Sequence, residues 1–208
     1  MRIDHLAFRV ADRNKTVEFF QKALGYKVQT EFTIEFGEGD TAKCFALEPP
    51  EKLSLPVGVL PWVFDGVIYT GGGEKWDGSN RFQEVVTSPV QEHLQQYHMP
   101  PEIFVSDGTP GSIVGNWVAA RGGVGGLHHI AYQVKSVKDT MEEWKAKGYA
   151  EFTSEKPFEC PGLTQCFTKP SALCGVIFEF IEREEFGFCA GNVKELMKST
   201  AGLDALIK

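Results

Sequence analysis

The chain has 208 residues, a formal net charge of −7 at pH 7, 42% hydrophobic residues and 12% aromatic residues. This is enough apolar material for one large domain or two small ones that fold unaided. The acidic balance and the lack of a basic run argue against nucleic acid and anionic membranes as partners. No apolar window approaches the roughly 18 residues that a membrane span requires, and we expect no signal peptide.

The cysteines bear on the cellular compartment. There are five, and none of them forms a C-x-x-C pair: Cys44, Cys160, Cys166, Cys174 and Cys189. An odd number without metal-type spacing is more typical of free thiols than of a disulfide framework. We therefore expect five free thiols and a cytoplasmic protein.

The N-terminal residues 2–10 alternate in the manner of a β-strand. One face of this strand is apolar and consists of Leu6, Phe8 and Val10. A helix that follows should pack on the apolar face, which leaves His5 and Arg9 on the opposite, open face.

That helix is expected between Asp12, which is suited to its N-cap, and Gly25, which is suited to its C-terminal end. Two further strands are predicted at about 27–36 and 41–48, joined by a Gly-rich turn. Proline and glycine punctuate residues 49–100, where we expect an inserted segment with a short hairpin and a helix near 89–97. Such an insertion could cover a site as a lid or be a surface embellishment.

The chain then returns to the sheet. A strand is predicted at 101–105, followed by a turn at 108–111 and a helix at 112–120. After this, the chain repeats its opening. His129-Ile130-Ala131 matches His5-Leu6-Ala7, and a Gly-Tyr pair follows each predicted helix at an equivalent distance.

The second unit completes the same pattern. Ser136 and Asp139 resemble a capping box at the start of its helix. Strands are predicted at about 150–155, 163–169 and 175–182, and a helical tail follows. The sequence therefore predicts an α+β fold in which two tandem βαβββ modules form one cupped mixed β-sheet. We place the modules at 1–124, with an insertion at about 49–100, and at 125–208, with the helical tail.

Strand parity selects a candidate metal site. His5 and His129 occupy equivalent faces of the two repeated strands, whereas His128 is expected to face the helix and make ordinary hydrogen bonds. Glu179 is a lone carboxylate between two phenylalanines, so its burial would require a cation or strong donors. Two histidines and one carboxylate form a facial triad that leaves three coordination positions open and suits Fe(II) oxygen chemistry.

Glu102 is a candidate fourth ligand. It precedes the position of the first module that corresponds to Glu179. The alternative is that Glu102 binds no metal and is simply a charged residue at the edge of a strand. His93 and His98 flank a predicted surface helix and are expected to be solvated.

The doubled pattern resembles the vicinal-oxygen-chelate superfamily, which includes glyoxalases, bleomycin-resistance proteins and dioxygenases. The C-terminal part is similar to the catalytic half of 4-hydroxyphenylpyruvate dioxygenase. Residues 165–170, 179–183 and 187–192 are similar to that family's Q-x-F-T-K-P, E-x-I-Q-R and G-F-G-x-G-N motifs, in the same order. The present chain departs from these motifs at Glu182 and Cys189, and the family's chains are much longer.

This resemblance makes His5, His129 and Glu179 ligands of Fe(II), with Co, Mn or Zn as alternative metals. It also implies a substrate pocket, which the tail helix would gate. The pocket residues that it implies are Gln165, Phe167 and Phe188. Gln165 and Phe167 share one face of their predicted strand, which suits a polar aromatic substrate.

The leading hypothesis is an Fe(II)-dependent dioxygenase that oxidises a small 2-oxo acid or a related aromatic substrate. Residues 125–130 also resemble methylmalonyl-CoA epimerase, in which Glu102 would match a fourth ligand. An epimerase, isomerase or lyase of that type is the second hypothesis, and a non-catalytic small-ligand-binding protein of the same fold is the third. The expected partner is a small molecule, and the chain is expected to be a monomer or homodimer.

Overall fold

The computed structural model describes residues 2–49, 62–64, 67–69, 101–183 and 188–203. The chain divides into two compact units, one formed by residues 1–49 and 101–208 and the other by residues 50–100. In the second unit, β4 (Trp62–Phe64) and β5 (Val67–Tyr69) pair as the predicted antiparallel hairpin. The helix expected near 89–97 lies outside the described residues.

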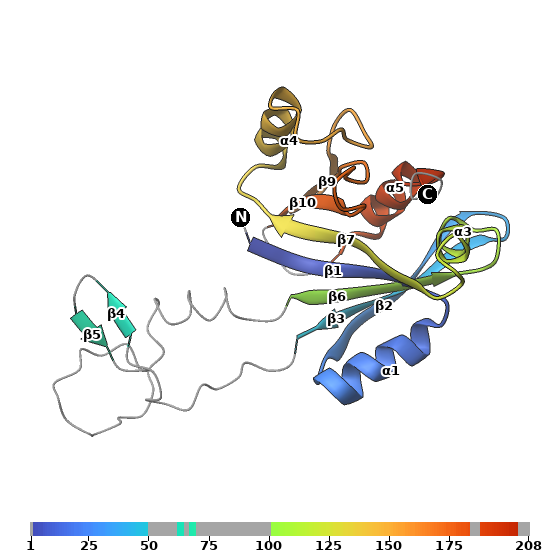
Figure 1. The fold of residues 1–208 in the computed structure, drawn as a ribbon. Helices are drawn as coiled ribbons and strands as arrows, with labels where there is room; N and C mark the ends of the chain where they lie inside the picture. The colour runs from blue at the N-terminus through green and yellow to red at the C-terminus, as the bar shows by residue number, and fades with distance from the viewer. Residues whose placement is uncertain (1, 50–61, 65–66, 70–100, 184–187, 204–208) are drawn as a thin grey trace, which may run out of the picture. The chain divides into compact units, whose positions relative to one another are not determined.

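The first unit is built on one eight-stranded, curled mixed sheet with the order β2-β3-β6-β1-β7-β10-β9-β8 (Figure 1). Its strands are β1 (Arg2–Val10), β2 (Lys27–Gly37), β3 (Asp40–Glu48), β6 (Glu102–Gly108), β7 (Gly125–Gln133), β8 (Phe158–Cys160), β9 (Leu163–Phe167) and β10 (Ile177–Arg183). Its helices are α1 (Arg13–Leu24), α3 (Ile113–Ala119), α4 (Val137–Ala146) and α5 (Ala190–Ser199).

The two halves of this sheet have the same topology. In each half the first strand runs parallel to the last, as β1 does to β6 and β7 to β10, and the other pairs are antiparallel. The halves meet where β1 and β7 pair antiparallel at the centre. This arrangement confirms the predicted α+β fold of two βαβββ modules, whereas the exact module boundaries at residues 124 and 125 stay a prediction.

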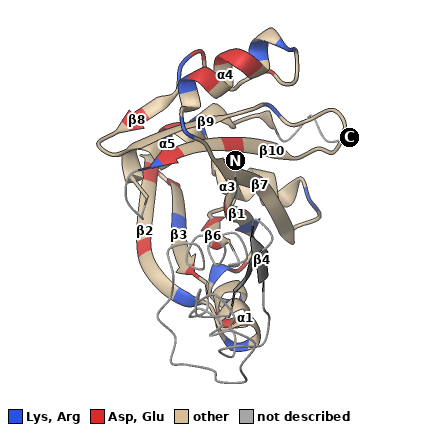
Figure 2. Cartoon of the chain, turned by 90° about the vertical axis from the view of Figure 1, so that its left-hand side faces the viewer, with Lys and Arg blue, Asp and Glu red and all other residues tan. Residues whose placement is uncertain are grey.

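The helix ends follow the predicted capping chemistry. The Asp12 side chain accepts a hydrogen bond from the backbone N–H of Lys15 at 3.0 Å, and Gly25 ends α1 with a φ of 77°. Ser136 caps α4 by accepting from the backbone N–H of Asp139 at 3.2 Å. Figure 2 shows acidic and basic segments side by side on α4, which is typical of a solvent-facing helix surface.

Helices α1 and α4 cover one face of the sheet. The opposite face carries the side chains of His5, His129 and Glu179. Val17 of α1 packs with Phe8 and Val10, as predicted. Met141 of α4 packs with Phe180 in the equivalent place of the second half. On the other face, α3 and α5 contribute to a core cluster around Ala7 and Phe104, with the helix residues Val114, Trp117, Val118, Val193 and Met197.

One predicted strand differs from the structure. The strand expected at 150–155 is only a single bridge between Phe152 and Thr168, and the short strand β8 follows it. None of the helices within the described ranges is long and apolar enough to cross a membrane.

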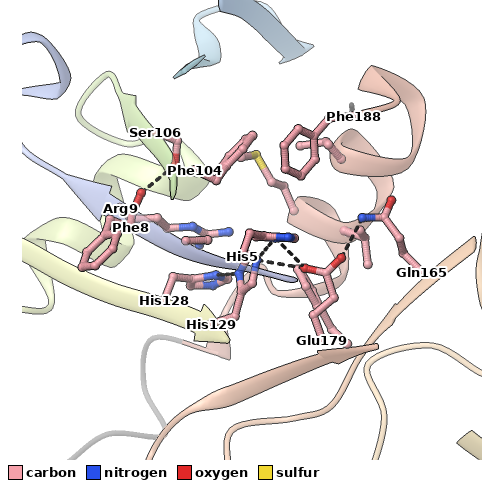
Figure 3. Close-up of a pocket in the computed structure, with 15 residues that line it drawn as sticks. His5, Phe8, Arg9, Phe104, Ser106, His128, His129, Gln165, Glu179 and Phe188 are labelled. Atoms are coloured by element: carbon pink, nitrogen blue, oxygen red, sulfur yellow. Dashed lines mark hydrogen bonds and ion pairs between the residues drawn. The ribbon is translucent and has the colours of Figure 1, made fainter. Parts of the chain in front are cut away.

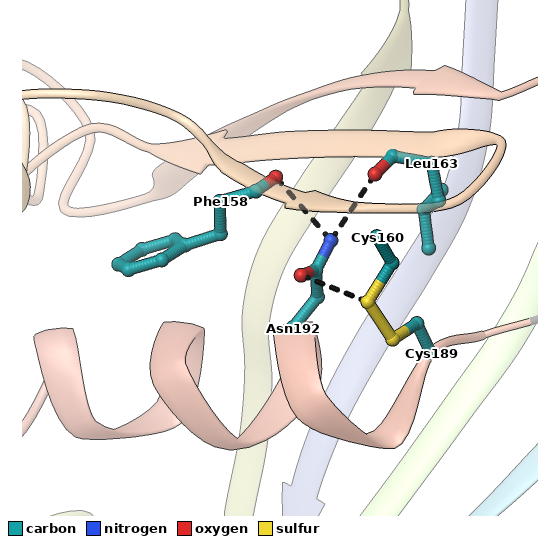
Figure 4. Close-up of a disulfide and its surroundings, with 5 residues drawn as sticks. All are labelled: Phe158, Cys160, Leu163, Cys189 and Asn192. Atoms are coloured by element: carbon teal, nitrogen blue, oxygen red, sulfur yellow. Dashed lines mark hydrogen bonds between the residues drawn. A yellow bond between two sulfur atoms is a disulfide. The ribbon is translucent and has the colours of Figure 1, made fainter.

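A disulfide joins Cys160 of β8 to Cys189, the residue before α5 (Figure 4). The expectation of five free thiols is therefore wrong for these two cysteines, whereas Cys44, Cys166 and Cys174 are free. The spacing of 29 residues carries no sign of this pair. The fold brings the two together because α5 packs against β8 and β9, where Asn192 donates to the carbonyl oxygens of Phe158 and Leu163.

Candidate metal centre

The polar face of the sheet lines a pocket (Figure 3). Both halves of the sheet and helix α5 contribute to its walls. Most of the lining is apolar, and the polar lining residues are His5, Arg9, Ser106, His128, His129, Gln165 and Glu179.

Three side chains converge in this cavity. The Nε2 atoms of His5 and His129 lie 3.2 Å and 2.9 Å from Oε2 of Glu179 and 3.2 Å from each other. Donors about 2.1 Å from one ion are about 3.0 Å apart on an octahedral face and about 3.4 Å apart at tetrahedral angles. The observed separations of 2.9–3.2 Å are close to these values, so the three atoms are close enough to bind one ion. Within the described ranges, these residues form the one group of His, Cys, Asp or Glu side chains close enough to share an ion.

Strand pairing explains why residues so distant in the sequence meet. His129 lies opposite Ala7 in the central β1–β7 ladder, two residues from His5 on the same face. Glu179 of β10 lies beside Ala131 of β7, again two residues from His129. Each side chain points from a different strand to the same face, and all three are at least 93% buried.

Hydrogen bonds from neighbouring residues orient these side chains. Nδ1 of His5 lies 2.7 Å from Oδ1 of Asp4, so a proton on Nδ1 leaves the Nε2 lone pair directed at the centre. Nδ1 of His129 lies 2.8 Å from Nδ1 of His128. The Gln165 amide donates to Oε1 of Glu179 at 2.6 Å, which leaves Oε2 to face the histidines.

The charge states of the cluster follow from its burial and from its mutual contacts. Burial, the largest single effect, would lower the pKa of His5, but the carboxylates of Glu179 and Asp4 together raise it to about 9. Burial would raise the pKa of Glu179, but the two histidines hold it well below its usual range. Burial lowers the pKa of His129 despite its contact with Glu179. Without a metal, the cluster is therefore an ion pair between protonated His5 and ionised Glu179, with His129 neutral.

The structure does not bring Glu102 into this cluster. Its carboxylate lies 3.5 Å from the guanidinium of Arg183, which also pairs with Asp4. The strand register shows which residue of the first module occupies the position that corresponds to Glu179. Phe104 stands opposite Ala7 as Glu179 stands opposite Ala131, so the first module has a phenylalanine at the position of the acidic ligand.

The structure places the predicted pocket residues Gln165, Phe167 and Phe188 in the cavity wall. The Phe167 ring lies 4.7 Å from the His129 ring, and the Phe188 ring lies 5.1 Å from that of His5. These rings exclude water from two sides of the histidine pair. Sequence motifs found these positions, whereas Phe104 was missed because its place depends on strand register.

The predicted orientation of His128 is wrong. In the β1–β7 ladder, Ala7 pairs with His129 and Phe8 pairs with Leu127, so His128 is the extra residue of a β-bulge. The bulge turns its side chain from the helix-packed face to the cavity, where its ring lies 5.4 Å from that of Trp117. Burial, Arg9 and the adjacent His129 lower the pKa of His128, which keeps this ring neutral.

Comparison with known proteins agrees with this architecture. The family model of the Glyoxalase/Bleomycin resistance protein/Dioxygenase superfamily matches residues 2–180. The chain belongs to this superfamily, most members of which are metal-dependent enzymes. The resemblance to the superfamily is thus confirmed. A comparison with curated proteins finds no match.

Solved structures of several activities share the fold. A triple mutant of 4-hydroxymandelate synthase from Streptomyces coelicolor has a TM-score of 0.61 and 15% identity, over 96% of this chain and 53% of that one. A methylmalonyl-CoA epimerase has a TM-score of 0.55 and 16% identity, over 89% and 97%. A hypothetical protein from Bacillus halodurans has a TM-score of 0.54 and 18% identity, over 90% and 98%. Identities this low show a common fold and leave the reaction open.

Proposed function

We propose that this protein is an Fe(II)-dependent dioxygenase that acts on a small 2-oxo acid or a related substrate. His5, His129 and Glu179 would hold the metal, and Gln165, Phe167 and Phe188 would line the substrate pocket. Fe(II) in such a site supplies O₂ activation and Lewis-acid polarisation of a chelating substrate. The protein's own residues position the ligand atoms and exclude water from the site.

The observation that carries this proposal is the convergence of three donor atoms, from His5, His129 and Glu179, within 3.2 Å of one another in a buried site. A facial triad leaves the opposite positions open for a bidentate substrate and O₂. Phe104 at the position that mirrors Glu179, and the pairing of Glu102 with Arg183, support three protein ligands rather than four. The similarity of residues 165–170, 179–183 and 187–192 to 4-hydroxyphenylpyruvate dioxygenase supports the same reaction class.

Each pocket residue has a separate task in this proposal. Gln165 holds Oε1 of Glu179, so that one carboxylate oxygen faces the metal. Its own Oε1 is buried and has no hydrogen-bond partner among the described residues, which makes it an acceptor for a substrate hydroxyl or amide. The rings of Phe167 and Phe188 flank the histidines and exclude water from the reacting atoms.

The test is metal analysis of anaerobically purified protein, together with oxygen uptake against a panel of aliphatic and aromatic 2-oxo acids. Stoichiometric iron and substrate-dependent uptake support the dioxygenase. Glu179→Gln is the matched negative control and should abolish both. Iron-loaded protein that consumes no O₂ with any acid of the panel contradicts the proposal.

A metal-dependent epimerase is the second candidate. The methylmalonyl-CoA epimerase from Mycobacterium tuberculosis is comparable in length, since the match covers 88% of this chain and 89% of that one. In that reaction class the metal polarises a carbonyl beside the proton that is removed. Deuterium exchange into methylmalonyl-CoA in D₂O, without O₂ uptake, would favour this alternative.

A further inference from the structure

His5 is held at both of its ring nitrogens, and strand β10 acts on each of them. Nε2 of His5 lies 3.2 Å from Oε2 of Glu179, and Nδ1 lies 2.7 Å from Oδ1 of Asp4. Asp4 in turn pairs with the guanidinium of Arg183. Glu179 and Arg183 are four residues apart in β10, so strand alternation directs both side chains to the same face. One strand therefore carries both a candidate metal ligand and the partner of Asp4.

The guanidinium of Arg183 lies between several elements of the fold. Its Nη2 atom pairs with Asp4 of β1 and lies 3.5 Å from Oε2 of Glu102 in β6. All three charged side chains are at most 11% exposed, so water competes little for these contacts. The Phe188 ring, which lies 5.1 Å from the His5 ring, also covers the guanidinium, with Cζ 5.4 Å from the ring centroid. These contacts hold the guanidinium in one place beside the metal centre.

Asp4 requires such an anchor because it is the chain neighbour of His5. Adjacent residues of a regular strand point to opposite faces. The pairing of β1 with β7 shifts register between Ile3 and Leu6, and this irregularity allows the two side chains to meet. The same Oδ1 atom of Asp4 accepts from His5 and from Arg183. The position of the guanidinium therefore sets the position of the oxygen that orients His5.

We propose that Arg183 is a positioning residue of the metal centre: its guanidinium holds Oδ1 of Asp4 at Nδ1 of His5 and so directs Nε2 of His5 at the ion. This inference rests on the proposed metal-dependent function and adds a residue to it. Lysine should not replace Arg183, because an ammonium group is a point charge without a planar face. It cannot contact two carboxylates and also lie flat against the Phe188 ring.

The test compares Arg183→Lys with the wild type, as full-length protein titrated with Co(II) under anaerobic conditions. This substitution conserves the charge near the ion, so a change in affinity reports on position. Arg183→Lys should weaken Co(II) binding by about fivefold, less than the loss of a direct partner of a metal ligand would, and should shift the d–d absorption bands. In the Asp4→Asn background it should change the affinity by less than about twofold, because the carboxylate through which it acts is gone.

Arg13→Lys is the matched control. Arg13 is also buried, lies 3.0 Å from a carboxylate oxygen of Glu31 and stacks on the Phe45 ring at 4.3 Å. Neither of these partners belongs to the metal centre. Arg13→Lys should therefore leave the Co(II) affinity and the absorption spectrum unchanged, even where it destabilises the fold.

The outcomes separate the positioning role from the proposed function. Losses that are equal with and without the Asp4 carboxylate overturn the positioning role alone, as do an affinity and a spectrum that Arg183→Lys leaves unchanged. If Arg183→Lys does not fold, Arg183→Met decides the question. Removing a positive charge near the ion would by itself tighten Co(II) binding, so weaker binding supports the proposal and equal or tighter binding overturns it. Wild-type protein that binds no Co(II) overturns the proposed function and the positioning role together.

Discussion

The Nε2 atoms of His5 and His129 lie 3.2 Å apart although 124 residues separate them in the chain. Two like-signed imidazolium groups could not occupy such positions in a buried site, because their repulsion would be unscreened. The pair is compatible with burial only if at least one ring is neutral, so that one Nε2 accepts a hydrogen bond from the other or both lone pairs face a cation. This relationship is the basis of the first predictions.

Replacing Glu179 by Gln or His129 by Ala should weaken Co(II) or Fe(II) binding by about 100-fold or more, because each variant removes one of three ligand atoms. Equilibrium dialysis with metal analysis measures this loss, and circular dichroism checks that the fold survives. Glu102→Gln is the matched control, since Glu102 pairs with Arg183 outside the cluster. A loss of binding in Glu102→Gln equal to that in Glu179→Gln would show a four-ligand site.

Asp4 is expected to act as a positioning residue for His5. Its carboxylate accepts from Nδ1 of His5 at 2.7 Å, which fixes the ring and directs Nε2 inward. Asp4→Asn should therefore weaken metal binding by about 10-fold, the usual scale for a lost partner of a histidine ligand. The d–d absorption spectrum of the Co(II) protein should shift as well, which a purely structural role would not cause. Asp139→Asn, at an exposed position on α4, serves as the control and should change neither property.

Metal binding should release about one proton at neutral pH. In the metal-free protein, the nearby carboxylates outweigh burial and raise the pKa of His5 to about 9, so this ring is protonated at pH 7 and must lose its proton to bind a metal. Glu179, whose pKa is lowered, and His129, whose pKa is also lowered, are already deprotonated. Apparent affinity should therefore rise about tenfold per pH unit and level off near pH 9.

Calorimetry in buffers of different ionisation enthalpy measures this proton release directly. Asp4→Asn provides an internal comparison, because the loss of one carboxylate lowers the pKa of His5 and should move the plateau to lower pH. An affinity that does not depend on pH between 6 and 9 would contradict the assignment of His5.

Strand alternation and the internal repeat were sufficient to predict much of this centre. Parity placed His5, His129 and Glu179 on one face of their strands, and the repeat placed two of these strands at equivalent positions. His128 was misplaced because a β-bulge reverses parity, and no residue type at 127–129 marks the bulge. The Cys160–Cys189 pair was missed for a similar reason, since β8 is only three residues long and its contact with α5 is tertiary.

Gly125 should be intolerant of substitution because it sits at the start of the strand that carries His129. Its φ is 88°, and an added Cβ would lie 2.0 Å from the carbonyl oxygen of Arg9 in the neighbouring strand. Gly125→Ala should reduce the free energy of unfolding by about 3 kcal/mol or more, through backbone strain and displacement of β1 from β7. Chemical denaturation measures the change.

Gly122 provides the control for that substitution. Its φ is also positive, at 69°, but no atom lies within 4 Å of an added Cβ. Gly122→Ala should therefore show the strain alone, about 1 kcal/mol. Equal losses in the two variants would mean that the close approach of Gly125 to Arg9 does not limit the β1–β7 pairing.

The Cys160–Cys189 disulfide should stabilise the fold and order the region beside Phe188. It closes a loop of 29 residues, for which the loss of unfolded-state entropy corresponds to about 3.6 kcal/mol. The double variant Cys160→Ser, Cys189→Ser should lose stability on this scale in guanidinium denaturation, whereas Cys174→Ser, at an exposed free thiol, should not. Phe188 contacts the His5 ring and directly precedes Cys189, so the double variant should also bind 2-oxo acids more weakly while it retains its metal. Unchanged stability and unchanged ligand binding after complete reduction would show that the packing of α5 against β8 alone positions this wall of the cavity.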